Sequence, residues 1–158
     1  MKARSILKLI IAVVVCELAG VIGSVFTVSA ISNWYATLTK PGINPPSWIF
    51  GPVWTTLYAV MGIAAFLVWK KGWARPGIRK ALTVFALQLA LNALWSIVFF
   101  GLHSPGWAFV NIIALWLAII WTMVLFYRIS KPAMWLLLPY VAWVSFAAYL
   151  NYAIWSLN

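Results

Sequence analysis

The chain has 158 residues, of which 66% are hydrophobic and only 8% are charged, with a formal net charge of +10. A soluble domain is about 45–50% apolar and about 25% charged, so this composition excludes a water-exposed globule and predicts a membrane protein. The chain has one acid (Glu17), one histidine (His103) and one cysteine (Cys16). This inventory excludes paired-carboxylate hydrolysis, a Ser-His-Asp relay and a disulfide within the chain, and we expect no metal site and no required cofactor.

Five apolar runs follow one another along the chain, each long enough to cross a bilayer as a helix. They cover residues 6–28, 46–69, 79–100, 107–127 and 133–155. The one long connection, residues 29–45, contains Lys40-Pro41-Gly42 and Asn44-Pro45, so it cannot be a single helix and is expected to fold over a helix end. We therefore predict an all-α membrane protein, with residues 1–158 forming a single transmembrane domain built as a five-helix bundle.

The positive charges are distributed according to this five-span arrangement. Ten of the 11 Lys and Arg residues fall on one side of the bilayer, and only Lys40 falls on the other. The ten are Lys2, Arg4, Lys8, Lys70, Lys71, Arg75, Arg79, Lys80, Arg128 and Lys131. The positive-inside rule then places the N-terminus in the cytoplasm and the C-terminus outside. The positive net charge is therefore explained by the orientation of the spans in the membrane, and we expect no nucleic-acid partner.

The first run has a competing interpretation as a signal peptide, because Val28-Ser29-Ala30 resembles a cleavage site. Its apolar stretch is longer than a usual signal sequence, and cleavage would remove the charge pattern described above. Glu17 lies in the middle of this run, where a lone carboxyl group is costly. It either packs inside the bundle in a protonated or hydrogen-bonded form, couples proton movement to transport as the first-helix Glu of small multidrug exporters does, or contacts a ligand.

The 12 tryptophans divide into those at span ends, which suit the headgroup level, and those inside spans, whose indole N–H needs an acceptor. We expect at least some of the second group to line an internal cavity; they are Trp54, Trp95, Trp116, Trp121 and Trp143. Two prolines, Pro52 and Pro139, predict helix kinks just before Trp54 and Trp143.

Two helix faces combine rings with amides. Gln88 and Asn92 share a face with Trp95, and buried amides there require partner helices or a ligand. The fifth run presents a face with a gap at Ala147, which leaves room for a flat guest, although tight helix packing explains the same pattern. That face consists of Tyr140, Trp143, Ala147, Leu150 and Asn151.

The order of motifs resembles that of the translocator protein (TspO/MBR) family. The motifs are Trp34-Tyr35, Lys40-Pro41, Pro45-Pro46, Gly51-Pro52-Val53-Trp54, Gln88-Leu89-Ala90-Leu91-Asn92, Phe99-Phe100-Gly101, Pro139-Tyr140, Ala142-Trp143 and Leu150-Asn151-Tyr152. The resemblance implies a five-helix bundle, often a homodimer, with a cavity covered by the loop between helices one and two. It also implies binding of porphyrins, notably protoporphyrin IX, of sterols, and of benzodiazepine-type drugs.

The resemblance also marks positions in this chain. The implied ligand-binding residues are Ser24, Thr27, Phe50, Val53, Trp54, Asn92, Trp95, Trp107, Val110, Trp143, Ala147 and Leu150. Trp54 and Trp143 are implied as catalytic in a light- and oxygen-dependent breakdown of bound protoporphyrin. One departure favours porphyrin over sterol, because no Lys or Arg follows Lys131 to complete the sterol motif of vertebrate members.

Three function classes remain open from the sequence: a porphyrin-binding sensor or carrier, a Glu17-coupled small-molecule transporter, and a structural or regulatory membrane partner. Because Cys16 and His103 are not obvious paired axial ligands, we expect metal-free porphyrin to bind without iron ligation. The absence of an N-terminal targeting extension favours a prokaryotic plasma membrane. Ala86 and Ala90 would permit close helix contact in a homodimer.

Overall fold

The computed structural model describes residues 2–158, and all regular structure in that range is helical. The elements are α1 (Ala3–Ser32), α2 (Trp34–Thr37), the 3-10 turn η1 (Ser47–Ile49), α3 (Phe50–Trp69), α4 (Pro76–Ser96), the π-helical turn η2 (Ile97–Gly101), α5 (Pro105–Ile129), α6 (Lys131–Leu136) and α7 (Leu138–Leu157). Five segments are long and apolar enough to cross a membrane: Ala3–Ile31, Ser47–Trp69, Pro76–Gly101, Pro105–Ile129 and Lys131–Leu157. The prediction of an all-α bundle with five spans is confirmed, and the chain is an integral membrane protein.

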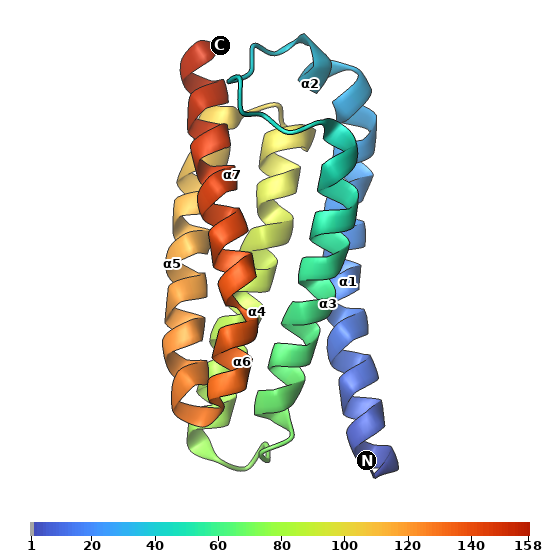
Figure 1. Ribbon diagram of the computed structural model, residues 1–158, viewed down its shortest axis with the longest axis vertical. Helices are drawn as coiled ribbons and strands as arrows, with labels where there is room; N and C mark the ends of the chain where they lie inside the picture. The colour runs from blue at the N-terminus through green and yellow to red at the C-terminus, as the bar shows by residue number, and fades with distance from the viewer. Residues whose placement is uncertain (1) are drawn as a thin grey trace.

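The bundle has two chemically different ends, with the N-terminus at one and the C-terminus at the other (Figure 1). We call the first the basic end; it comprises residues 2–8, 70–80 and 128–131 and carries ten of the 11 Lys and Arg residues. The second is the loop end, which comprises residues 33–49 and 101–104 and carries Lys40. The charge segregation inferred from the sequence is therefore present in the fold, while the compartment that each end faces stays a prediction.

Helices α1 and α3 touch closely in the half of the bundle next to the basic end. A Cβ atom added at Gly62 would lie 2.5 Å from Val13 Cα. Met61 and Val68 of α3 are 0% exposed. Glycine at the contact removes the side chain that would otherwise separate the two backbones, so this half is solid.

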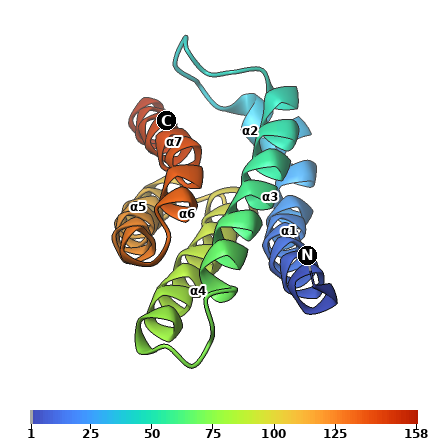
Figure 2. The ribbon, with the colours of Figure 1, turned by 60° about the horizontal axis from the view of Figure 1, so that its bottom comes forward.

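The fifth span is broken, and the break separates its packing partners. Helix α6 packs mainly on α3 and α5, whereas α7 packs on α5 and meets α3 little. Pro139 occupies the second position of α7, where a helix tolerates the missing N–H, and Leu137 forms the junction. Helices α3 and α7 diverge toward the loop end (Figures 1 and 2).

The expectation of kinks is therefore half right. The break near Pro139 is present, but Pro52 lies in the first turn of α3, directly after the 3-10 turn η1. At that position the N–H has no partner within the helix in any case, so proline marks the start of α3 and does not bend it.

Candidate functional site

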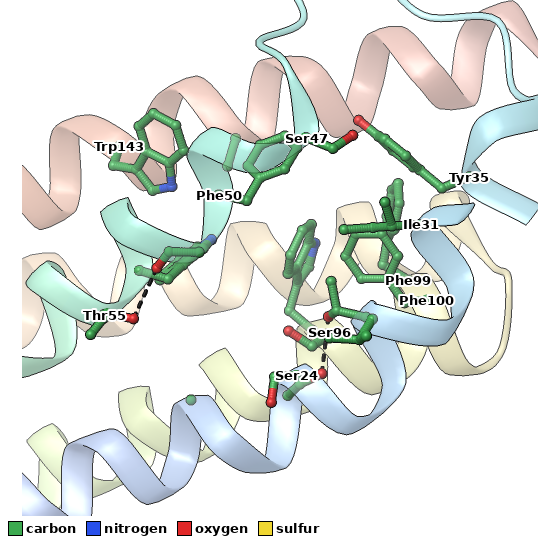
Figure 3. A pocket seen from close by; sticks show the side chains of 18 of the residues that line it. Ser24, Ile31, Tyr35, Ser47, Phe50, Thr55, Ser96, Phe99, Phe100 and Trp143 are labelled. Atoms are coloured by element: carbon green, nitrogen blue, oxygen red, sulfur yellow. Dashed lines mark hydrogen bonds between the residues drawn. The ribbon is translucent and has the colours of Figure 1, made fainter. Parts of the chain in front are cut away.

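A cavity of about 430 Å³ lies in the loop half of the bundle, between α1, α3, the α4–η2 junction and α7. This volume falls within the range of roughly 300–1,000 Å³ that is typical of small-molecule sites. Most of its wall is aromatic or small, and Figure 3 shows side chains from several elements directed into the same space. The rings that line it are Tyr35, Trp48, Phe50, Trp54, Tyr58, Trp95, Phe99, Phe100 and Trp143.

The π-helical turn η2 supplies one side of the cavity. Leu102 N–H bonds to the carbonyl of Ile97 at 2.9 Å, an i to i+5 bond that widens the end of the fourth helix. The wider turn brings Phe99 and Phe100 into the wall, with exposed fractions of only 2% and 7%. The Phe99 ring stacks on that of Trp95 with centroids 5.2 Å apart. Such π turns occur frequently at functional sites, and this one concentrates flat surfaces there.

The connection between α1 and α3 covers the cavity through Tyr35, which is buried. Its hydroxyl donates to Asn44 Oδ1 at 3.0 Å, and Lys40 Nζ lies 4.7 Å from its ring centroid. Burial raises the pKa of Tyr35, an effect that the hydrogen bond to Asn44 partly offsets, so the phenol stays neutral at physiological pH. The buried, uncharged ring of Tyr35 therefore forms part of the inner surface of the loop that covers the cavity.

The same cover is attached to the end of α7 by a reciprocal pair of hydrogen bonds. Thr39 N–H donates to Asn158 Oδ1 at 3.0 Å, and Asn158 Nδ2 donates to the carbonyl of Thr39 at 2.9 Å. These bonds join segments 119 residues apart in sequence. The amide of Asn158 therefore links the loop to the last transmembrane helix.

A chain of hydrogen bonds, which we call the floor network, lies on the basic-end side of the cavity and reaches its wall through Tyr58. Tyr58 donates to Asn92 Oδ1, Asn92 Nδ2 donates to the Tyr140 hydroxyl at 2.8 Å, and Tyr140 donates to Gln88 Oε1 at 2.7 Å. Gln88, Asn92 and Tyr140 are each no more than 2% exposed. Of the two interpretations left open for the amides, the structure supports partner helices for Gln88 and Asn92, because their polar atoms are satisfied within the protein.

Trp95 is satisfied in the same way, whereas Trp143 is not. The indole N–H of Trp95 donates to Asn151 Oδ1 at 2.9 Å. Trp143 Nε1 is buried and has no hydrogen-bond partner among residues 2–158, yet its ring lines the cavity, 6.4 Å from that of Phe50. An unpaired buried donor costs free energy unless a ligand supplies the acceptor. Trp143 Nε1 is thus a buried side-chain donor without a partner in the described chain, on a ring that lines the cavity.

The structure brings eight of the 12 ligand-binding residues named from the resemblance into one wall. They are Ser24, Thr27, Phe50, Trp54, Trp95, Trp143, Ala147 and Leu150. Both of the residues expected to be catalytic, Trp54 on α3 and Trp143 on α7, are among them. Of the other mid-span tryptophans, Trp116 donates to Ser145 Oγ at 2.9 Å, and Trp121 lies on the outer surface.

The remaining four residues lie elsewhere within the described part of the chain. Val53 packs against the hydrophobic core, and Asn92 lies in the floor network. Trp107 and Val110 are 73% and 58% exposed on the outer face of α5, at a separate shallow depression. Contact of any of the 12 with a ligand stays a prediction.

Sequence reasoning missed several residues of the wall, chiefly Tyr35, Tyr58, Phe99 and Phe100. A signal for α1 was present in the sequence, because the residues that α1 contributes follow helical spacing. Glu17, Gly20, Ser24, Thr27 and Ile31 are separated by alternate steps of three and four. Nothing comparable predicted η2, whose sequence reads as ordinary helix.

The residues considered as axial ligands do not meet. Cys16 is buried in the packed core, and His103 stacks on Trp34 with ring centroids 4.5 Å apart. In the described residues 2–158, no group of three or more His, Cys, Asp or Glu is placed to hold a metal ion. Binding of porphyrin without iron ligation stays a prediction.

Comparison with known proteins gives a consistent result. The sequence profile of the TspO/MBR family matches residues 12–156. The chain is 46% identical over 155 residues to the tryptophan-rich protein TspO of Chlorobaculum tepidum, which covers 98% of both chains. It is 42% identical over 139 residues to the human translocator protein, covering 87% of this chain and 82% of the human one. It is 38% identical over 126 residues to the tryptophan-rich sensory protein of Cereibacter sphaeroides, covering 80% of this chain and 77% of that protein.

Proposed function

Because the chain belongs to the TspO/MBR family, we propose that its cavity binds a flat, largely apolar ligand, with protoporphyrin IX as the first candidate, and that the protein acts as a membrane sensor or carrier for it. The observation that carries this proposal is the ring-lined cavity itself. A flat macrocycle is recognised by stacking on aromatic faces and by a few placed polar atoms. The wall offers both, and sterols or benzodiazepine-type molecules are alternative guests for the same space.

The polar contacts of such a guest can be inferred from the hydrogen-bond donors of the wall that have no partner in the described protein. Three hydroxyl groups in the wall donate to their own helix: Ser24 to the carbonyl of Val21, Thr27 to that of Gly23 and Thr55 to that of Gly51. The buried N–H of Trp143 remains free for an acceptor on the ligand. We expect this contact to orient the ligand, while stacking supplies most of the affinity.

Light-dependent breakdown of bound protoporphyrin is part of the same proposal. An illuminated porphyrin passes energy or an electron to oxygen and can oxidise a neighbouring indole, so the reaction requires neither a metal nor a further cofactor. Trp54 and Trp143 approach the cavity from two different helices. Holding the ring against them would convert a collisional reaction into one within a bound complex.

The test is a titration of purified protein in lipid nanodiscs with protoporphyrin IX, followed by quenching of tryptophan fluorescence. We expect saturable quenching above the background of empty nanodiscs, and 1:1 stoichiometry per cavity. Quenching that rises linearly with porphyrin, as in plain lipid, would contradict the proposal.

A second candidate function is transport coupled to Glu17. The observation that favours it is the position of Glu17 in the cavity wall near the middle of α1. In vesicles that contain the protein, an imposed proton gradient would then drive ligand movement, and Glu17→Gln would abolish it. Gradient-independent ligand distribution in both proteins would leave the sensor or carrier function.

We also propose that the protein lies in a prokaryotic plasma membrane, with the basic end cytoplasmic, and forms a homodimer. Positive-inside statistics support the orientation. Ala86 and Ala90 are exposed one turn apart on α4, where a second copy could approach closely. A C-terminal reporter that is active in the cytoplasm would contradict the orientation, and a monomeric mass in nanodiscs would contradict the dimer.

A further inference from the structure

Glu17 is the sole acidic residue of the chain, and its place in the wall gives the cavity a defined electrical polarity. It lies on the face of α1 that also contributes Gly20, Ser24, Thr27 and Ile31 to the cavity. With a rise of 1.5 Å per residue, Glu17 and Ile31 are separated by about 20 Å along the helix. Glu17 therefore lies at the floor, and Ile31 at the end covered by the loop.

The carboxyl group has no partner in the described protein. Among residues 2–158 the structure contains no ion pair or hydrogen bond to the Glu17 side chain. The nearest phenol in the wall, that of Tyr58, already donates to Asn92. Ser24 and Thr27, the hydroxyl groups above it on the same face, donate to backbone carbonyls. A carboxyl group in an apolar wall whose neighbours are committed elsewhere requires a donor or a cation from outside the protein.

The Tyr58 ring lies one helical turn from Glu17 along α1, and a second ring, that of Trp54, stacks on it. Gly20, one turn along α1 from Glu17, has no side chain, and the Tyr58 ring occupies the space that a Cβ there would fill. Trp54 stacks on Tyr58 with centroids 5.6 Å apart and an interplanar angle of 30°. A carboxylate next to the faces of Trp and Tyr is a chemistry that recognises organic cations, through charge pairing and cation–π attraction.

At the opposite end of the cavity the nearest cation, Lys40, lies outside the wall, where its ammonium group donates to the carbonyl of Leu38. Lys40 is the one Lys or Arg of the loop end, and its ammonium group lies over the ring of Tyr35, which lines the cavity. Within the described wall, Glu17 is the only Asp, Glu, Lys or Arg residue. Positive charge on a guest is thus favoured at the floor, beside the one charged side chain of the described wall.

We propose that Glu17 makes the cavity selective for flat aromatic ligands that carry a protonated or hydrogen-bond-donating nitrogen, with that nitrogen held at the floor between α1 and the Trp54–Tyr58 pair. This inference rests on the proposed function, since it assumes that the cavity binds flat ligands. It adds the charge class and the orientation of the ligand. A porphyrin would be held with its ring N–H groups toward Glu17.

The experiment uses three flat probes of nearly equal size near neutral pH: 9-aminoacridine, a cation; acridine, its neutral counterpart; and acridine-9-carboxylate, an anion. Each is titrated into the wild type, Glu17→Gln, Glu17→Asp and Ser29→Ala in nanodiscs, with empty nanodiscs subtracted. We expect the wild type to bind the cation most tightly and the anion least tightly. In Glu17→Gln the cation should lose about tenfold in affinity, as expected for a charge-assisted contact, while acridine changes by less than about twofold.

The controls separate the two levels of the proposal. Glu17→Asp keeps the charge and should keep the preference for the cation. Ser29→Ala, an exposed site on α1 outside the wall, should leave the order of the probes unchanged. Equal losses for all three probes in Glu17→Gln, or no change in their order, would overturn charge selection while leaving ligand binding intact. No saturable binding of acridine to the wild type would instead contradict the proposed function.

Discussion

Helices α1 and α3 run side by side through both halves of the bundle, but they are packed differently in the two. Toward the basic end they touch through Gly62 and Val13, and no space remains between them. Toward the loop end the residues that face each other across the bundle are rings and short polar side chains, and a cavity of about 430 Å³ lies among them. The fold therefore joins a solid half to a hollow half along the same helices.

The hydrogen bonds show the same division. In the floor network, each amide and phenol has a partner on another helix, through Asn92, Tyr140 and Gln88. Above that floor, Trp143 Nε1 is buried without a partner in the described chain. Satisfied groups and close backbones stabilise the fold, whereas unsatisfied groups beside open space are what a binding site requires. Stability and binding should therefore respond to different substitutions.

The largest expected effect follows from closing the glycine contact in the solid half. Gly62→Val would place side-chain carbons against the backbone of Val13, and α1 would have to move. Overpacking of this kind costs about 1–3 kcal/mol. We expect a clear fall in the thermal unfolding midpoint in detergent. Gly51→Val, where an added Cβ meets nothing within 4 Å, is the matched control. Equal midpoints for the two variants would show that the α1–α3 contact at Gly62 is not packed as tightly as described.

The next effect concerns the floor between the halves. Asn92→Leu leaves the Tyr58 hydroxyl without its acceptor, which should cost about 1–3 kcal/mol of stability. Adding Tyr58→Phe removes the orphaned hydroxyl, so the double variant should recover part of the loss. Thermal midpoints of the four proteins give the coupling. Strictly additive losses would show that the network does not act as a unit, and a loss of ligand affinity without loss of stability would return Asn92 to the binding wall.

In the hollow half, Trp143→Phe should affect chemistry more than folding. The change deletes an N–H that has no partner among the described residues, so the unfolding midpoint should stay close to that of the wild type. An aromatic surface remains, so most protoporphyrin binding should be retained. We expect light-dependent loss of bound porphyrin to slow severalfold, measured by absorbance at equal occupancy. Equal rates in the two proteins would reject the catalytic role of Trp143.

The smallest expected effect is on the cover. Asn158→Ala removes both bonds to Thr39 at an exposed site, which should cost under about 1 kcal/mol. We expect ligand to dissociate a few times faster, because the loop opens more readily, with a nearly unchanged unfolding midpoint. Stopped-flow fluorescence measures this rate. Ser156→Ala, which removes only a hydrogen bond within α7, is the control. An equal effect in that variant would show that the Asn158–Thr39 bonds do not hold the loop over the cavity.

The two halves also differ in how far the sequence could predict them. The positions of the helices can be predicted from the length of the apolar runs and from helix-breaking residues. The two ends of the bundle can be predicted from the placement of Lys and Arg. Both signals are local or additive along the chain. The α7 side of the cavity could also be predicted from the sequence, since Trp143, Ala147 and Leu150 recur at helical spacing. Periodicity alone could not distinguish a cavity from tight packing at Ala147.

Other parts of the site depend on geometry that is not encoded in spacing. The π turn at Ile97–Gly101 is a change of hydrogen-bond register within an apolar run, and no residue type requires it. Whether Asn92 faces a ligand or Tyr140 depends on how three helices meet. Trp107 and Val110 are exposed on α5 because α4, α6 and α7 pack against its other faces, and this arrangement follows only from the assembled bundle.

If the loop half contains space for a flat ligand, Ala147→Phe should fill that space. Ala147 lines the cavity between Trp143 and Leu150, so a ring at this position would occupy the space of the guest. The decisive measurement is a protoporphyrin IX titration of this variant and the wild type in nanodiscs, with the unfolding midpoint recorded on the same samples. We predict a protein that folds with a midpoint near that of the wild type and binds porphyrin at least about tenfold more weakly. Binding as tight as that of the wild type would contradict the account, because the ligand would then lie outside this cavity.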